Sequence, residues 1–273
     1  MANFVQGFLR PGVKRIWCSG CGNGIILGAL VRAINKAGLK PDQMTLLSGI
    51  GCAGRSWAYV NFDVMATPHG RTLPCATGIK LARPELKVVV FTGDGDAVAI
   101  GGNHFIHAAR RNIDVTSIIL NNSIYGMTGG QSSPTTPYGM RSSTTIYSSI
   151  EQAFKISELA VTAGAVFVGR GTVYHAKLLD SLIEKALLKP GFSTVEVIAH
   201  CHTQYGRQNR LGTAVEMMEW QRDHAVEAKK AATMKPEELK DKVVIGVLVD
   251  KELPVYQDEY EKIRERAKGT IGG

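Results

Sequence analysis

The stretch LKVVVFTGDGDAVAIGGNHFIHAARRNIDVTSIILNN, residues 86–122, contains two apolar segments that each end in a polar turn. The segments 86–92 and 115–120 lack the alternation of a half-exposed strand, which predicts strands covered on both faces. A helical pattern at 97–111 separates them, as is typical of parallel strands joined by a helical crossover. The unit predicts a doubly wound, mostly parallel α/β sheet whose ligands bind at the carboxyl ends of the strands.

The rest of the chain repeats this alternation of strands and helices. Strands are expected at 44–48, 193–199 and, on a weaker pattern, 165–168, and helices at 23–37, 151–163 and 174–188. We interpret residues 1–215 as one α/β domain. Residues 216–273 are charged and helix-prone, with one strand-like stretch at 243–249. We interpret them as a C-terminal extension that docks a second subunit rather than as a second catalytic domain.

The composition narrows the class of protein. Of the 273 residues, 44% are apolar and 21% are charged, which excludes collagen, coiled coil and disorder. There is no run of about 18 apolar residues of the kind that a membrane helix needs. Residues 1–12, MANFVQGFLRPG, lack the basic and apolar regions of a signal peptide. We therefore expect a cytoplasmic protein with no membrane partner.

Positive charge is concentrated in the larger domain. Residues 1–215 contain 21 Lys or Arg and 11 Asp or Glu, whereas residues 216–273 contain 11 and 13. This excess favours an anionic ligand, such as a phosphorylated cofactor or an acidic substrate or protein. The basic residues are scattered and no nucleic-acid-binding signature accompanies them, so no nucleic-acid partner is expected.

Polar residues follow both strands of the opening stretch. The first strand runs into Gly93-Asp94-Gly95-Asp96 and the second into Asn121-Asn122, with 25 residues (96–120) between Gly95 and Asn121. An Asp carboxylate, an Asn carbonyl and a main-chain carbonyl form a hard oxygen site for Mg²⁺ that diphosphate oxygens can complete. The spacing resembles the thiamine diphosphate motif, and that resemblance implies Asp94, Asn122 and the main-chain carbonyl of Ile124 as Mg²⁺ ligands.

Four cysteines follow the predicted strands or precede the first helix. Cys18 and Cys21 form a CxxC, Cys52 follows the strand 44–48, and Cys201 follows the strand 193–199. Because the ends of parallel strands share one edge of the sheet, these thiols can converge. Four thiolates suit either a tetrahedral Zn²⁺ ion or an iron–sulfur cluster.

Several motifs in order along the chain carry a family resemblance. Five motifs occur in order between about residues 10 and 210: WCSGCG, GIGC, PHGRTLPCATGIKLARPE, FTGDGDAVAIGGNH and LNNSIYGMTGGQSSPTTP. Together they resemble the β subunits of 2-oxoacid:ferredoxin oxidoreductases. The GMTGGQSSPTTP loop is most similar to the 2-oxoglutarate (2-oxoglutarate synthase) branch. The resemblance implies a thiamine diphosphate-binding fold over residues 1–215 that also binds a [4Fe–4S] cluster through Cys18, Cys21, Cys52 and Cys201.

The resemblance also implies which residues bind thiamine diphosphate and its Mg²⁺. They lie after the strands or in the loop that follows Asn122: Ile50, Gly51, Cys52, His69, Gly93, Asp94, Gly95, Asp96, Asn122, Ile124, Gly126, Met127 and Thr128. His69 and Arg55 are the candidate catalytic residues, the arginine because it can bind a substrate carboxylate bidentately. Several relatives have a lysine in the long loop at the position of Gly129, so that positive charge is absent here.

The activity implied by the resemblance is the CoA-dependent oxidative decarboxylation of 2-oxoglutarate to succinyl-CoA and CO2, or its reverse. Electrons would pass through the cluster to ferredoxin, and an α subunit would supply the remaining part of the thiamine site. The expected assembly is a dimer of αβ units.

Two alternatives stay open from the sequence. One is the same reaction with pyruvate or a branched-chain 2-oxoacid. The other is a non-oxidative thiamine diphosphate decarboxylase or synthase whose cysteines bind a structural zinc ion.

Overall fold

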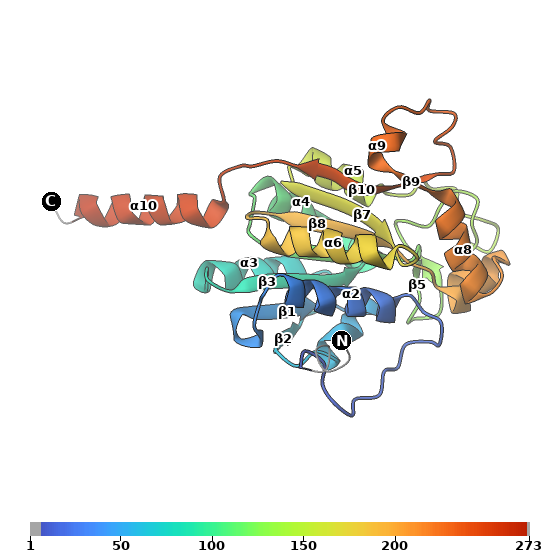
Figure 1. Ribbon diagram of the computed structural model, residues 1–273, viewed down its shortest axis with the longest axis horizontal. Helices are drawn as coiled ribbons and strands as arrows, with labels where there is room; N and C mark the ends of the chain where they lie inside the picture. The colour runs from blue at the N-terminus through green and yellow to red at the C-terminus, as the bar shows by residue number, and fades with distance from the viewer. Residues whose placement is uncertain (1–6, 272–273) are drawn as a thin grey trace.

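The computed structural model describes residues 7–271, and the side chains as far as residue 269. An eight-stranded sheet has the order β2-β1-β3-β4-β8-β7-β10-β9 and runs through the middle of the molecule (Figure 1). All neighbouring strands are parallel except β7 and β10. The strands are β1 Met44–Ser48, β2 Asp63–Ala66, β3 Lys87–Gly93, β4 Thr116–Asn121, β7 Phe167–Thr172, β8 Ser193–Ile198, β9 Ala225–Glu227 and β10 Val243–Asp250.

Helices cover both faces of this sheet, so the predicted doubly wound α/β fold is confirmed. On one face α2 (Asn23–Lys36) and α6 (Ala176–Leu188) pack on the sheet, and α3 (Thr72–Ala82), α4 (Gly102–Arg110) and α5 (Ile156–Ala163) pack on the other (Figure 1). Successive residues of β3 enter opposite cores: Val89 and Phe91 face the first layer, and Val88 and Val90 the second. An unbroken apolar strand therefore has a buried partner on each side.

The remaining elements are short. They comprise the antiparallel hairpin β5 (Ile124–Tyr125) and β6 (Gln131–Ser132), the helices α7 (Arg207–Asn209), α8 (Ala214–His224) and α9 (Ala228–Ala231), and helical turns at Pro41–Gln43, Ala53–Ala58, Gly95–Ile100 and His202–Gly206. The final helix, α10 (Tyr256–Ile271), extends away from the body of the protein (Figure 1).

Several features differ from the expectations. The helix expected at 97–111 is a π-helical turn at Gly95–Ile100 followed by α4. The helix expected at 151–163 begins only at Ile156, because the segment before it is extended and the Phe154 N–H donates to the Pro134 carbonyl. The edge strand β2 was not predicted, since most of its side chains are exposed. Helix α3 was not predicted either, and its sequence includes Pro74 and Gly78.

The carboxyl-terminal segment contributes to the main sheet. The strand predicted at 243–249 is β10, which pairs antiparallel with β7. The docking of a second subunit by residues 216–273 remains a prediction. Within the described residues, no helix combines the length and apolar character needed to cross a membrane. The expectation that residues 1–12 form no signal peptide falls partly on residues 1–6, which lie outside the described residues.

Candidate cofactor site

A cavity of about 120 Å³ lies at the carboxyl ends of β1, β3 and β4. The strand order reverses there, because the chain runs outward from β1 to β2 but in the opposite direction from β3 to β4, and ligands of open α/β sheets bind at such a point. All thirteen residues expected to bind thiamine diphosphate and Mg²⁺ line this cavity, together with Asn23, Ala53, Leu120 and Tyr125. The chain turns into it at Gly51, whose φ of +114° favours glycine.

Asp94 is buried in the floor of the cavity and is held by the long loop. Its Oδ2 accepts hydrogen bonds from the Ser133 hydroxyl at 2.7 Å and from the Thr135 hydroxyl. Burial raises the pKa of the Asp94 carboxyl above its usual range, while these hydroxyls oppose the shift. Because burial disfavours the charged form of this carboxyl group, a bound cation would stabilise the carboxylate.

Asp96, the second carboxylate of the GDGD turn, has different partners. Its Oδ1 accepts from the Gly70 N–H at 2.5 Å and lies 2.6 Å from Nδ1 of the His69 ring, while its Oδ2 accepts from the Thr92 hydroxyl. The ring of His69 also meets the ring of Tyr125 edge to face, with 6.0 Å between centroids. The structure thus connects Asp96 to the cavity through His69.

The two asparagines after β4 point to different places. Asn121 is buried, and its Nδ2 donates to Glu196 Oε1 at 2.8 Å. Asn122 lines the cavity, where its Oδ1 accepts from the Ile124 N–H at 3.3 Å. The first asparagine therefore anchors the turn in the sheet, and the second places a carbonyl oxygen next to Asp94 and the Ile124 main chain.

Glu196 organises a charged network beneath this turn. The carboxylate is buried in β8 and accepts from Arg170 Nε at 2.9 Å and from the Ser157 hydroxyl at 2.5 Å, in addition to Asn121. Its pKa lies below the usual range: burial acts to raise it, but the Arg170 guanidinium and the surrounding donors outweigh that effect. The network ties β4, β7, β8 and α5 together behind the cavity.

The four cysteines expected to bind a cluster gather beside the cavity. A side chain added at Gly126 would meet the sulfur atoms of Cys201 and Cys52, 3.4 and 3.6 Å away. The Thr203 hydroxyl lies 3.6 Å from Cys201 Sγ and 3.7 Å from Cys18 Sγ. Cys21 lies close enough to Cys18 and Cys201 for their charges to affect it.

Burial and the repulsion between neighbouring thiolates raise the pKa of Cys21 and Cys52. The pKa of Cys21 rises to about 11 and that of Cys52 to about 12, in each case chiefly because burial disfavours the thiolate. A bound cation would supply the charge that keeps them ionised. Within the described residues, no three His, Cys, Asp or Glu side chains are arranged to hold a single metal ion.

Neighbouring residues hold the cysteines in place. The Trp17 indole N–H donates to the Cys52 carbonyl at 2.7 Å, and His200 Nε2 lies 2.6 Å from the Gly20 carbonyl. Trp17 also packs edge to face against Tyr59. These contacts fix the CxxC loop against the turn after β1.

Arg55, the second candidate catalytic residue, does not line the cavity. It lies in the helical turn Ala53–Ala58, and its Nε is buried without a hydrogen-bond partner. Conversely, the sequence analysis missed Asn23, Tyr125, Ser133 and Thr135. Asn23 lies two residues after Cys21, and the other three lie in or beside the long polar loop, which was the available signal for them.

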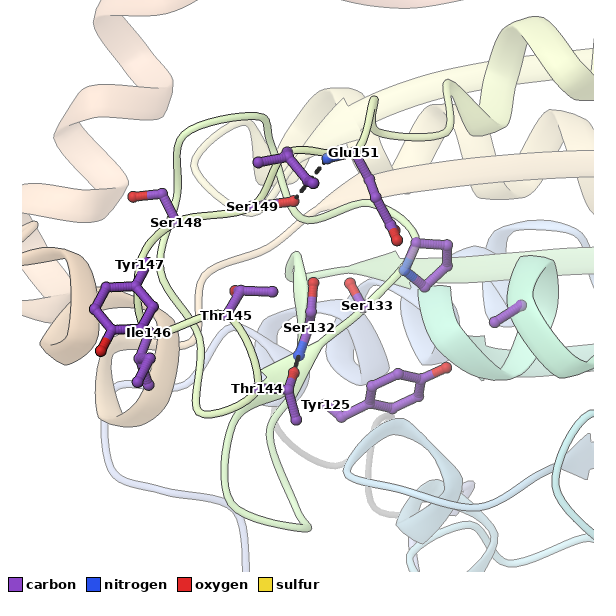
Figure 2. A pocket seen from close by; sticks show the side chains of 13 residues that line it. Tyr125, Ser132, Ser133, Thr144, Thr145, Ile146, Tyr147, Ser148, Ser149 and Glu151 are labelled. Carbon is purple, nitrogen blue, oxygen red and sulfur yellow. Dashed lines mark hydrogen bonds between the residues drawn. The ribbon is translucent and has the colours of Figure 1, made fainter.

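A second, larger cavity of about 610 Å³ adjoins the first (Figure 2). Figure 2 shows hydroxyl side chains of the long loop around it, among them Ser132, Ser133, Thr144 and Thr145. Tyr125 lines both cavities. Tyr147 and Ile150, on its outer wall, are 91% and 84% exposed.

The comparisons with known proteins agree with this geometry. Residues 49–197 match the family model of the thiamine pyrophosphate enzyme C-terminal TPP-binding domain. The chain is 47% identical to 2-oxoglutarate synthase subunit KorB of Methanocaldococcus jannaschii, over 94% of this chain and 95% of that protein. It is 39% identical to a 2-oxoacid:ferredoxin oxidoreductase subunit beta of Saccharolobus solfataricus, over 85% and 76% of the two chains.

A solved structure gives the same result. The 2-oxoglutarate:ferredoxin oxidoreductase from Magnetococcus marinus, with 2-oxoglutarate, coenzyme A and succinyl-CoA bound, superposes with a TM-score of 0.86 at 31% identity and covers 97% of this chain and 90% of its own. The fold and the family model thus define a thiamine diphosphate-binding enzyme domain. The chain belongs to the family of 2-oxoacid:ferredoxin oxidoreductase β subunits, which includes the KorB proteins.

Proposed function

We propose that this chain is the β subunit of a 2-oxoglutarate:ferredoxin oxidoreductase. The complex would convert 2-oxoglutarate and CoA to succinyl-CoA and CO2 and pass two electrons to ferredoxin, or run the reverse carboxylation. The observation that carries the proposal is the meeting of two sites on one chain: the cavity around Asp94 and Asn122 shares Cys52 with the group of four thiols. Electrons leaving the first site would reach the second over a short distance.

Thiamine diphosphate and Mg²⁺ fit the residues of the small cavity. When bound, the cofactor supplies a carbon nucleophile and an electron sink for loss of CO2. Asp94, Asn122 and the Ile124 carbonyl would hold Mg²⁺ with diphosphate oxygens, since they form a hard oxygen donor set beside glycine-rich backbone. Ser133 and Thr135 would keep the Asp94 carboxylate oriented.

An iron–sulfur cluster fits the four cysteines better than a single zinc ion. The Thr203 hydroxyl lies 3.7 Å from Cys18 Sγ and 3.6 Å from Cys201 Sγ, and no three ligands are arranged around a single metal ion in the described part of the chain. A [4Fe–4S] cluster takes one thiolate per iron around a wider centre. The five cysteines are all free thiols, in keeping with the reducing cytoplasm that we propose as its location.

An α subunit would complete the site. Large apolar side chains are exposed on the segment 138–154 beside the larger cavity, namely Tyr138, Ile146, Tyr147, Ile150 and Phe154. Such a group of exposed apolar side chains is typical of a protein–protein interface. We propose that the α subunit covers it and that two αβ units associate, with ferredoxin as the electron acceptor.

The substrate is tested with the αβ complex purified without oxygen. Supplied with CoA and ferredoxin, it should form succinyl-CoA from 2-oxoglutarate with a kcat/KM above that for pyruvate or branched-chain 2-oxoacids. A higher kcat/KM with pyruvate would assign the chain to the other substrate branch. Decarboxylation without any electron acceptor would instead favour the non-oxidative enzyme.

A further inference from the structure

The partners of Asp96 occupy both of its carboxylate oxygens. The side chain is 2% exposed, and it accepts from His69 Nδ1, from the Gly70 N–H and from the Thr92 hydroxyl. Gly49 lies so close that an added Cβ would collide with this carboxylate. Although Asp96 lines the cavity wall, its polar atoms are directed at the protein.

These contacts determine the state of the His69 ring. Both carboxylate oxygens of Asp96 accept hydrogen bonds from the Gly70 N–H and the Thr92 hydroxyl, so in the 2.6 Å contact with His69 we assign the hydrogen to Nδ1. The opposite nitrogen, Nε2, then has the lone pair in the neutral ring. About a third of the His69 side chain is exposed and it lines the cavity, while the edge contact with Tyr125 restricts rotation of the ring.

We propose that Asp96 is a positioning residue that acts through His69. It holds the imidazole as the Nδ1–H tautomer, so that Nε2 faces the cavity as the acceptor for an N–H or O–H donor held there. The identity of that donor, on the cofactor or on the 2-oxoacid, rests on the proposed function. The orientation of the ring does not, because it follows from the contacts within this chain.

A different role for Asp96 would be to shape the turn at Gly70 and nothing more. The two roles differ in how Asp96 and His69 combine. If Asp96 acts through the ring, removing its carboxylate has no further effect once the ring is gone, because residues in one network are not additive. If it shapes the turn only, the loss is the same with and without His69.

The test is a double-mutant cycle in the αβ complex with Asp96→Ala, His69→Ala and the double variant. The dissociation constant for thiamine diphosphate, measured by calorimetry on the cofactor-free complex, and the KM for 2-oxoglutarate are determined for each. In the His69 background we expect Asp96→Ala to weaken one of these by about tenfold. In the His69→Ala background the same change should alter it by less than about twofold.

The parameter that changes identifies the donor. A change in the dissociation constant for thiamine diphosphate indicates that the donor is a group of the cofactor, and a change in the KM for 2-oxoglutarate indicates that it is a group of the substrate. Equal losses in both backgrounds for both parameters would overturn the proposal. Because Asp96→Ala could prevent folding, Asp96→Asn is taken through the same cycle. It conserves the volume and one acceptor oxygen, and any loss it causes must also vanish without His69.

Asp180→Ala is the matched control. Asp180 is another buried aspartate, paired with Arg32 at 2.8 Å in the contact between α2 and α6. Its replacement should lower the melting temperature and leave the cofactor constant and KM unchanged. If it weakened cofactor binding as much as Asp96→Ala, the effect would reflect general destabilisation and the proposal would fail. The calorimetric measurement of thiamine diphosphate binding does not depend on catalytic turnover. A complex that lacks the proposed activity can therefore still be used to test this inference.

Discussion

The two adjoining cavities differ in how completely this chain builds them. Around the smaller one, Asp94 and Asp96 each accept at least two short hydrogen bonds from their own chain, and Glu196 braces the turn below. The larger one has an outer wall of loop residues on which Tyr147 and Ile150 are almost fully exposed. The chain thus builds the smaller cavity from its own hydrogen-bonded residues and leaves the outer wall of the larger cavity exposed. This difference is expected if a second subunit covers the outer wall.

The largest expected effect concerns the cation end of the smaller cavity. Asp94→Ala should reduce activity and thiamine diphosphate retention by at least about 100-fold, since it removes a carboxylate ligand. Ser133→Ala, which removes one hydroxyl donor to that carboxylate, should cost about tenfold. Cofactor content per chain and CoA-dependent activity of the αβ complex measure both, and normal retention in Asp94→Ala would remove the assigned site.

The buried network around Glu196, beneath the cavity, should have the largest effect on the free energy of unfolding. Glu196→Ala leaves the buried Arg170 without its inner partner and should lower the free energy of unfolding by about 3–5 kcal/mol, a fall of roughly 10 °C in melting temperature. The control is Glu158→Ala, because Glu158 contacts the same arginine at 2.5 Å but is 53% exposed. That change should cost at most about 1 kcal/mol. Equal losses would show that burial does not separate the two carboxylates.

The outer wall of the larger cavity should respond only in subunit association. Replacing Tyr147 and Ile150 together by serine should weaken binding of the α subunit by about 10- to 100-fold, the range for apolar residues at the centre of an interface. Leu188→Ser is the control: this exposed leucine ends α6, away from the long loop. Binding measured with immobilised α subunit would contradict the account if the control and the double variant behaved alike.

A small effect is expected at the thiols. Thr203→Val removes a hydroxyl that lies near both Cys18 and Cys201. A hydrogen bond to sulfur stabilises the reduced, more negative cluster, and about 1 kcal/mol of lost stabilisation lowers a one-electron potential by roughly 40 mV. Thr203→Ser should retain the wild-type value. A redox titration followed by EPR checks both, and an unchanged potential in Thr203→Val would exclude this contact.

The sequence predicts the centre of the fold better than its periphery. β1, β3, β4 and β8 are short stretches with a strong apolar content, and each was located within about two residues. β2 and α3 were not predicted because an exposed edge strand and a helix containing Pro74 and Gly78 have little periodic signal. The late start of α5 depends on a hydrogen bond to the distant Pro134, which local sequence does not encode.

The candidate site likewise has features that the sequence predicts and features that it does not. Motif spacing placed Asp94 and Asn122 at one edge of the sheet, because strand ends of one sheet converge, and the family resemblance implied the other expected residues that line the small cavity. Spacing could not predict the partners of Asp94 and Asp96, because these come from distant residues: Ser133 and Thr135 for Asp94, and His69 and Thr92 for Asp96. The resemblance implied Arg55 as a contact of the substrate carboxylate, and this arginine lies in the helical turn after Cys52 without lining the small cavity, so its role stays a prediction.

The central claim is that a thiamine site and an electron-transfer cluster share this chain. The most direct measurement is the iron, sulfide and zinc content of the αβ complex purified without oxygen, with a reduced-state EPR spectrum, compared with a Cys52→Ser variant. The account predicts about four iron and four sulfide per β chain beyond any held by the α subunit, and their loss in the variant. Zinc without sulfide would contradict it and support the non-oxidative thiamine enzyme.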